Sequence, residues 1–168
     1  MTTSPLISDP PPWCEIRLGE RSMRYRRLGA GRPVVLLSAL PATDAIWPEA
    51  LEAIAAKHRV YAPDLSSEMA GIGPWLREFL DGVGAEHPTL IATSTLCIPA
   101  LEYALLDPYR LQSLILIPDG SVDDTGLDGT LGTANGSATL PILVTRREHP
   151  SGSAAELLMR FLHRPDQR

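Results

Sequence analysis

Cysteine, histidine and lysine are all scarce in this chain of 168 residues. It contains 2 cysteines, Cys14 and Cys97, together with 4 histidines and a single lysine, Lys57. The cysteines form neither a CxxC pair nor a histidine-rich cluster, so we expect no disulfide framework, no metal site and no other cofactor. Free thiols of this kind fit a reducing compartment, and we therefore expect a cytoplasmic protein.

Long apolar runs and targeting signals are missing as well. No apolar run approaches the roughly 18 residues that a membrane-spanning helix needs. The N-terminus has neither the basic flank nor the apolar core of a signal peptide, and we expect residues 1–12 to be a flexible tail before a single domain at 13–168. The net charge of −5 and the pI of about 5.3 argue against nucleic acid or a membrane surface as the partner.

What the chain does have is a regular succession of apolar segments. Residues 14–31 alternate between apolar and polar on either side of Gly19-Glu20, which predicts a β-hairpin. Continuous apolar runs, typical of strands buried in a parallel sheet, alternate with helical stripes that have Pro near the start or Gly near the end. The predicted strands are residues 33–39, 59–65, 88–94, 111–118 and 140–146, and the predicted helices are residues 44–58, 73–84 and 95–106.

This order of elements predicts an α/β protein, with a mostly parallel sheet and helices on both faces. Between two of the strands, residues 119–139 are rich in Gly, Asp, Thr and Ser and are expected to be a loop. The capping box S-x-x-E at residues 153–156 predicts a last helix that continues through residue 162.

The stretches "RRLGAGRPVVLLSALPATDAIWPEALEAIAAKHRVYAPDL" and "GPWLREFLDGVGAEHPTLIATSTLCIPALEYALLDPYRLQSLILIP" together resemble the α/β-hydrolase family. The former is similar to its third strand, oxyanion loop, first helix and fourth strand. The latter is similar to its second helix, nucleophile strand and elbow, third helix and sixth strand, and "LPILVTRREHP" is similar to its seventh strand. The resemblance implies a short member of the fold that is truncated at its C-terminus and lacks the cap domain.

The resemblance places Ser94 at the nucleophile elbow, but the elbow motif departs from the family's G-x-S-x-G. It reads Ala92-Thr93-Ser94-Thr95-Leu96, and the flanking glycines normally leave room for a strained turn at the serine. We therefore expect a buried Leu96 to have widened or relaxed the elbow. The alternative role for Ser94 is the N-cap of the following helix.

The resemblance also implies an oxyanion hole, formed by the backbone N–H groups of Thr95 and Leu40. The loop that carries the second donor reads Ser38-Ala39-Leu40-Pro41 where the family usually has His-Gly-x-Pro. The tryptophans Trp47 and Trp75 are expected to close the core or to line a pocket above the strand ends.

The sequence matches the family less well at the positions of the catalytic acid and base than at the nucleophile. His149 stands where the family has its aspartate, and no residues remain to build the eighth strand that precedes the family's histidine. Asp119, after the sixth strand, is a candidate acid, although an Asp-Gly turn also accounts for it. His58, His87 and His149 are otherwise expected to be surface residues, and we expect no histidine within reach of Ser94.

Three functions remain open at this point. The first is a diverged, non-hydrolytic protein with an incomplete triad, which binds a small apolar ligand, a protein partner or a second copy of itself. The second is an esterase-like serine hydrolase that acts on a small ester, with Ser94 as the nucleophile, His149 as the base and Asp119 as the acid. The third is a lyase, isomerase or cyclase on the same fold.

Overall fold

The computed structural model describes residues 12–38, 47–65, 72–118, 126–129, 131, 140–145, 160 and 162, with backbone only for residues 47–50. The described strands form one seven-stranded sheet in the order β1-β2-β4-β3-β5-β6-β7. From β4 to β7 all neighbouring strands are parallel, and only β1 and β2 are antiparallel to their neighbours. The predicted fold class is therefore confirmed.

The predicted hairpin is present and forms one edge of the sheet. Strand β1 (Trp13–Leu18) pairs with β2 (Arg21–Leu28), and the register from Leu18↔Arg21 leaves Gly19 and Glu20 as the two-residue turn. Gly19 has a φ of +60°, which is the left-handed conformation that such short turns require. The hairpin tip lies beyond the end of β4, because β2 pairs with that strand only from Tyr25 to Leu28.

The parallel strands and their connecting helices follow the predicted order. The strands are β3 (Arg32–Leu37), β4 (His58–Pro63), β5 (Thr89–Thr93), β6 (Ser113–Ile117) and β7 (Ile142–Val144). The helices are α1 (Trp47–Ala55), α2 (Ile72–Gly82) and α3 (Cys97–Leu106), with short 3-10 turns at η1 (Ser94–Leu96) and η2 (Pro108–Arg110). Parallel strands joined in this way bring all their carboxyl ends, and hence Ser94, to one edge of the sheet.

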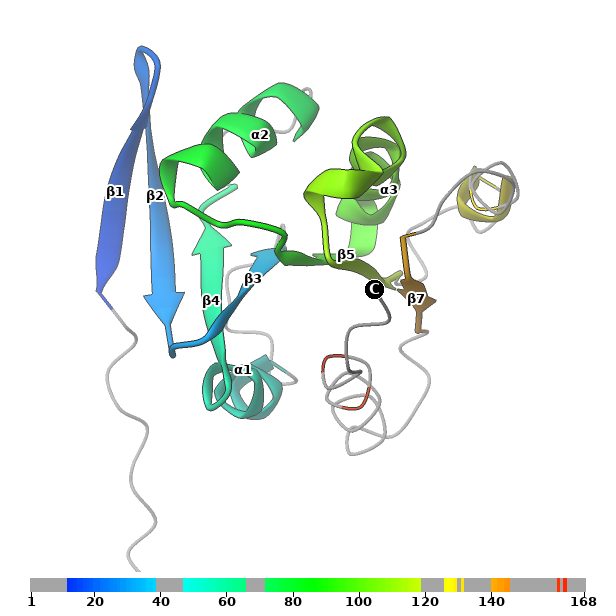
Figure 1. Cartoon of the computed structure of the whole chain (residues 1–168), viewed down its shortest axis with the longest axis horizontal. Helices are drawn as coiled ribbons and strands as arrows, with labels where there is room; N and C mark the ends of the chain where they lie inside the picture. The colour runs from blue at the N-terminus through cyan, green and yellow to red at the C-terminus, as the bar shows by residue number, and fades with distance from the viewer. Residues whose placement is uncertain are drawn as a thin grey trace, which may run out of the picture.

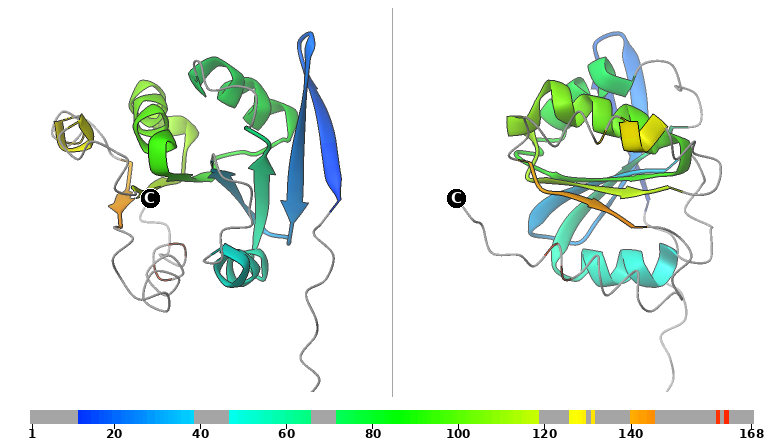
Figure 2. Two further views of the ribbon diagram at one scale, coloured as in Figure 1. Left: turned by 180° about the vertical axis from the view of Figure 1, so that it is seen from behind. Right: turned by 90° about the vertical axis from the view of Figure 1, so that its right-hand side faces the viewer.

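The molecule has three layers, with α2 and α3 on one face of the sheet and α1 on the other (Figures 1 and 2). Alternate residues of the buried strands supply the two cores, as a pleated sheet requires. Leu90 and Leu114 face α2 and α3, whereas Ile91 and Ile115 face Ile54 of α1. The larger core, beneath α2 and α3, is the one that supports the turn at Ser94.

Two expectations about the periphery were wrong. Residues 126–129 and 131, expected to belong to a loop, are helical, and Leu127 is buried against the larger core. His58, expected on the surface, is only 6% exposed, because it begins β4 directly below the end of α1. Its ring Nδ1 lies 3.3 Å from the carbonyl oxygen of Ile54. His87 is exposed, as expected.

Candidate functional site

Ser94 occupies the turn between strand β5 and the helical segment that follows it. As expected, β5 is buried at every position and ends at Thr93, and η1 and α3 follow without a break. Ser94 has a φ of +53°, in the left-handed region that a residue with a side chain adopts only under strain. The expectation of a relaxed elbow is wrong: the strained serine turn persists without either flanking glycine.

The bulk of Leu96 is absorbed by the core rather than by the turn. Its backbone has ordinary helical angles, with φ −83° and ψ −8°, so no glycine is needed there for conformational reasons. Its side chain is 2% exposed and belongs to the larger core, which confirms that it is buried. Ala92 is fully buried, and its methyl group is the smallest side chain that could replace the first glycine.

The alternative role of Ser94 as a helix N-cap is also wrong. The N-cap positions are Thr93 for η1 and Leu96 for α3, and neither residue makes a capping hydrogen bond with its side chain. The carbonyl of Ser94 accepts a hydrogen bond from the backbone N–H of Cys97. Ser94 therefore does not occupy the N-cap position of either helical segment.

Exposure and backbone geometry suit Ser94 and Thr95 for contact with a small molecule. Ser94 is half-buried and Thr95 is exposed. The N–H of Thr95 lies in the first turn of η1, where backbone N–H groups have no acceptor within the helix. Ser38 directly follows β3, whose last residue, Leu37, pairs with Ala92 of β5, so Ser38 lies at the same sheet edge as Ser94.

The other predicted site residues are placed less fully. Leu40, Asp119 and His149 fall outside the described residues, and of Trp47 only the backbone is described, as the first residue of α1. Two histidines can be excluded as the base. His58 begins β4 and His87 precedes β5, so both lie at the amino edge of the sheet. At about 3.3 Å per residue, a five-residue strand holds that edge roughly 17 Å from Ser94.

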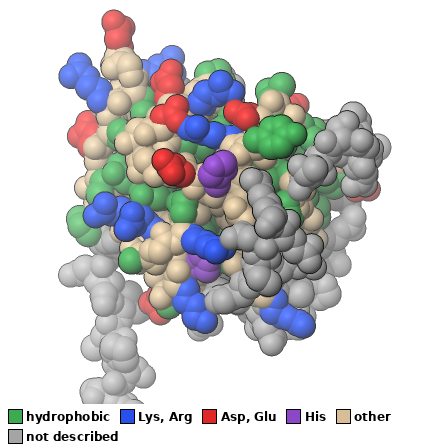
Figure 3. Space-filling view, in the orientation of Figure 1, with side chains coloured by type: hydrophobic (Ala, Val, Ile, Leu, Met, Phe, Trp, Pro, Cys, Tyr) green, Lys and Arg blue, Asp and Glu red, His purple; other side chains and the backbone are tan. Residues whose placement is uncertain are grey.

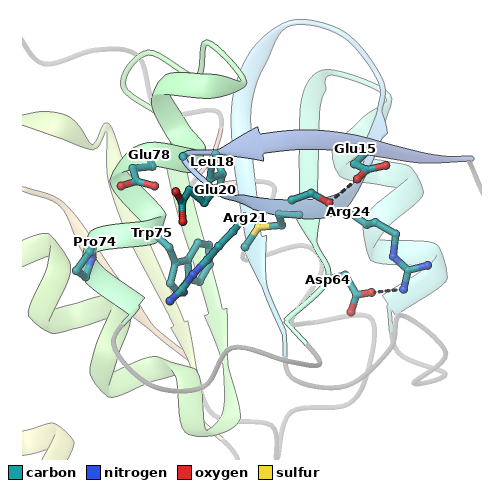
Figure 4. Close-up of a pocket in the computed structure, with 12 residues that line it drawn as sticks. Glu15, Leu18, Glu20, Arg21, Arg24, Asp64, Pro74, Trp75 and Glu78 are labelled. Atoms are coloured by element: carbon teal, nitrogen blue, oxygen red, sulfur yellow. Dashed lines mark hydrogen bonds and ion pairs between the residues drawn. The ribbon is translucent and has the colours of Figure 1, made fainter.

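Trp75 lines a cavity at the same sheet edge, as the sequence led us to expect of a tryptophan at this position. The cavity has a volume of about 740 Å³ and lies among the hairpin tip, the end of β4 and the first turns of α2 (Figure 4). Sequence reasoning missed the hairpin residues that form its other walls, because a pattern of alternating residues does not show that a hairpin tip projects beyond its neighbour.

Charge is mixed over the visible surface rather than gathered into a patch of one sign (Figure 3). Burial raises the pKa of Tyr103, with a further contribution from the carboxylate of Asp107, and burial followed by the nearby Cys14 raises the pKa of Tyr25. Neither tyrosine belongs to the turn at Ser94. The described part of the chain has no cluster of three His, Cys, Asp or Glu residues suited to a metal ion, and no helix with the length and hydropathy to cross a membrane.

Comparison with known proteins supports the hydrolase fold. No family model matches the chain. A curated relative, the pimeloyl-[acyl-carrier protein] methyl ester esterase of Aeromonas hydrophila, is 33% identical over 104 residues, covering 57% of this chain and 41% of that protein. The chain thus spans about two fifths of the length of this relative.

Solved structures match over more of the chain but with lower identity. Naproxen esterase from Bacillus subtilis has a TM-score of 0.67 at 12% identity, covering 90% of this chain and 91% of that one. A predicted CIB-like hydrolase from Thermoplasma acidophilum has a TM-score of 0.64 at 14% identity, covering 90% and 97%. An epoxide hydrolase from Vigna radiata has a TM-score of 0.54 at 17% identity, covering 65% and 40%. By its sheet order and these similarities, the chain has the α/β-hydrolase fold.

Proposed function

We propose that the protein is a serine hydrolase that cleaves small carboxylic esters, with Ser94 as the nucleophile. The observation that carries the proposal is the φ of +53° at Ser94. Such strain persists only where the surrounding structure enforces it, and it is concentrated at sites where a side chain must be presented for chemistry. A serine without a chemical role could adopt an unstrained turn here, particularly next to a residue as large as Leu96.

The reaction follows from the position of this serine. The Oγ of Ser94 attacks the ester carbonyl carbon, its proton passes to a base and then to the departing alkoxide, and an alcohol leaves as the acyl group becomes attached to the serine. Water then attacks the acyl group and regenerates the hydroxyl. The backbone N–H of Thr95 is suited to donate a hydrogen bond to the oxyanion that forms in both steps, with the N–H of Leu40 as the proposed second donor.

The proposed base and acid are the candidates His149 and Asp119, which sets this proposal against the expectation that no histidine lies within reach of Ser94. His149 follows β7 and Asp119 follows β6, so both are proposed to act from the sheet edge at which Ser94 lies. In this proposal His149 accepts the proton of Ser94, and Asp119 orients the imidazole ring. A small ester as the substrate is supported by the esterase names of one curated relative and one solved structure.

The second candidate is the diverged, non-hydrolytic protein, which would bind a small apolar molecule or a protein partner in the same region. The observation that favours it is the pair Ala92 and Leu96, both fully or almost fully buried, in place of the two elbow glycines. Without a base near Ser94, the hydroxyl is a weak nucleophile at neutral pH, and the region around it would bind a molecule without cleaving it.

Labelling with a fluorophosphonate, followed by hydrolysis of p-nitrophenyl butyrate, separates the two candidates. We expect stoichiometric labelling of the intact chain at Ser94 and ester turnover that Ser94→Ala abolishes. Ser22→Ala is the matched control and should leave both signals unchanged. Ser22 is an exposed serine on the hairpin that donates a hydrogen bond to Glu15. Absence of labelling in a protein that melts cooperatively would refute the hydrolase and favour the binding protein.

A second variant tests the base. His149→Ala should lower the turnover of p-nitrophenyl butyrate by about 100-fold or more, the contribution typical of general acid–base catalysis. His87→Ala, at the opposite edge of the sheet, should leave turnover unchanged. Equal activity of both variants would exclude His149 as the base while leaving the assignment of Ser94 intact.

A further inference from the structure

The cavity beside the hairpin is separate from the turn at Ser94. It lies against β2 and the end of β4, whereas Ser94 follows β5, and two to three strand spacings of about 4.8 Å place the two sites roughly 10–14 Å apart across the sheet. Ser94 does not line the cavity. Its volume of about 740 Å³ is in the range of pockets that hold small organic molecules.

The walls of the cavity carry an excess of negative charge. Four carboxylates and two guanidinium groups line it, for a net charge of −2. Part of this charge is already compensated, because Arg24 forms an ion pair with Asp64 at 2.9 Å. Glu15 accepts a hydrogen bond from the hydroxyl of Ser22, which leaves its negative charge in place. Arg21 also lines the cavity and has an interaction of its own.

Two of the remaining carboxylates are those of Glu20, in the hairpin turn, and Glu78, on α2. Neither carboxylate makes a hydrogen bond or an ion pair within the described part of the chain, and Figure 4 shows both on the same flank of the cavity, above the Trp75 ring. Both side chains are exposed, so each can form an ion pair with a cation that enters the cavity.

The inner wall is apolar and includes an indole. Leu18, Met23, Pro74 and Trp75 contribute to it, and Trp75 is only 7% exposed. The indole N–H of Trp75 has no hydrogen-bond partner among the described residues, although it is buried. An apolar wall next to carboxylates is a favourable environment for an organic cation, through apolar contact and ion pairing together.

We propose that this cavity binds a small organic ammonium compound that carries an apolar group. The ammonium lies between Glu20 and Glu78, and its hydrocarbon part packs against Trp75 and Leu18. The site does not depend on Ser94 chemistry, so it holds whether or not the protein hydrolyses esters.

The test is an NMR titration of the intact chain with 2-phenylethylammonium chloride, observed at the tryptophan indole N–H signals. The chain has 3 tryptophans, and Trp75→Phe identifies the signal of Trp75 by its disappearance. We expect a saturable shift of the Trp75 signal that also occurs in Ser94→Ala. The neutral analogue 2-phenylethanol should bind at least about twofold more weakly, because each of two ion pairs at a partly exposed site contributes about a 1.4-fold to fivefold change in affinity.

Charge variants supply the decisive comparison. The double variant Glu20→Gln, Glu78→Gln should weaken the binding of 2-phenylethylammonium at least about twofold and leave the binding of 2-phenylethanol unchanged. Glu102→Gln, an exposed glutamate of α3 outside the cavity, is the matched control and should bind as the parent does. Equal binding of the alcohol and the ammonium would overturn the proposal, as would equal weakening by Glu102→Gln or shifts confined to the other two tryptophans.

Discussion

Replacement of Leu96 by glycine restores the second glycine of the family's elbow motif and tests how this chain tolerates its absence. Because Leu96 has helical backbone angles and a 2% exposed side chain, we attribute its role to core packing rather than to the conformation of the turn. Leu96→Gly should therefore destabilise the protein, although it brings the sequence closer to the family pattern.

The magnitude follows from two contributions. Truncation of a buried leucine to alanine lowers the free energy of unfolding by about 2–5 kcal/mol, because apolar contacts are lost and a cavity remains. Glycine adds no helix-interior penalty here, because Leu96 is the N-cap of α3, a position at which glycine is preferred to leucine. The expected loss of about 2–5 kcal/mol is a large share of the roughly 5–15 kcal/mol that stabilises a typical domain.

Urea unfolding followed by circular dichroism measures this loss. Leu106→Gly is the matched control, because Leu106 ends the same helix but is 81% exposed and contributes little packing. The difference between the two variants isolates the buried side chain and should be about 2–5 kcal/mol. If the two variants unfold within about 1 kcal/mol of each other, the side chain of Leu96 does not support the elbow and our explanation of the missing glycine is refuted.

Two further substitutions test the packing of the sheet and a buried tyrosine. Gly29 has a φ of +68°, and a Cβ there would lie 2.1 Å from the carbonyl oxygen of Ala55, so Gly29→Ala should lower the urea midpoint well beyond Gly19→Ala, whose Cβ would meet nothing within 4 Å. Equal midpoints would contradict the close approach. Burial raises the pKa of Tyr103 above its ordinary value of 10.0, so the unfolded chain releases this proton first and stability falls as the pH rises above about 10. Tyr103→Phe should reduce that alkaline loss in unfolding measured between pH 8 and pH 11, whereas Tyr109→Phe, at a residue 70% exposed, should not.

The periodicity of the sequence was sufficient to predict most of the fold, because each buried strand is a continuous apolar run and each helix carries an apolar stripe. The runs at 88–94 and 111–118 became β5 and β6, and the alternation about Gly19 became the hairpin. The prediction of an exposed His58 was wrong because its burial is not a local property of the sequence. Its burial depends on α1 returning over the start of β4, and a polar residue next to Lys57 gives no local sign of that contact.

The position of Ser94 at the end of a buried strand and the start of a helix was determined by the sequence alone, since apolar periodicity and chain order require nothing from distant residues. The conformation of Ser94 was decided by the tertiary structure. The size of Leu96 predicted a relaxed turn, but the side chain found space in the core beneath α2 and α3, and φ at Ser94 remained +53°. The cavity beside Trp75 likewise depends on how far the hairpin tip extends past β4, which is set by strand pairing. The apolar periodicity of the sequence specifies which helices and strands form and which faces they bury. The space for a side chain at a turn between a strand and a helix depends on residues that come into contact only when the helices pack on the sheet.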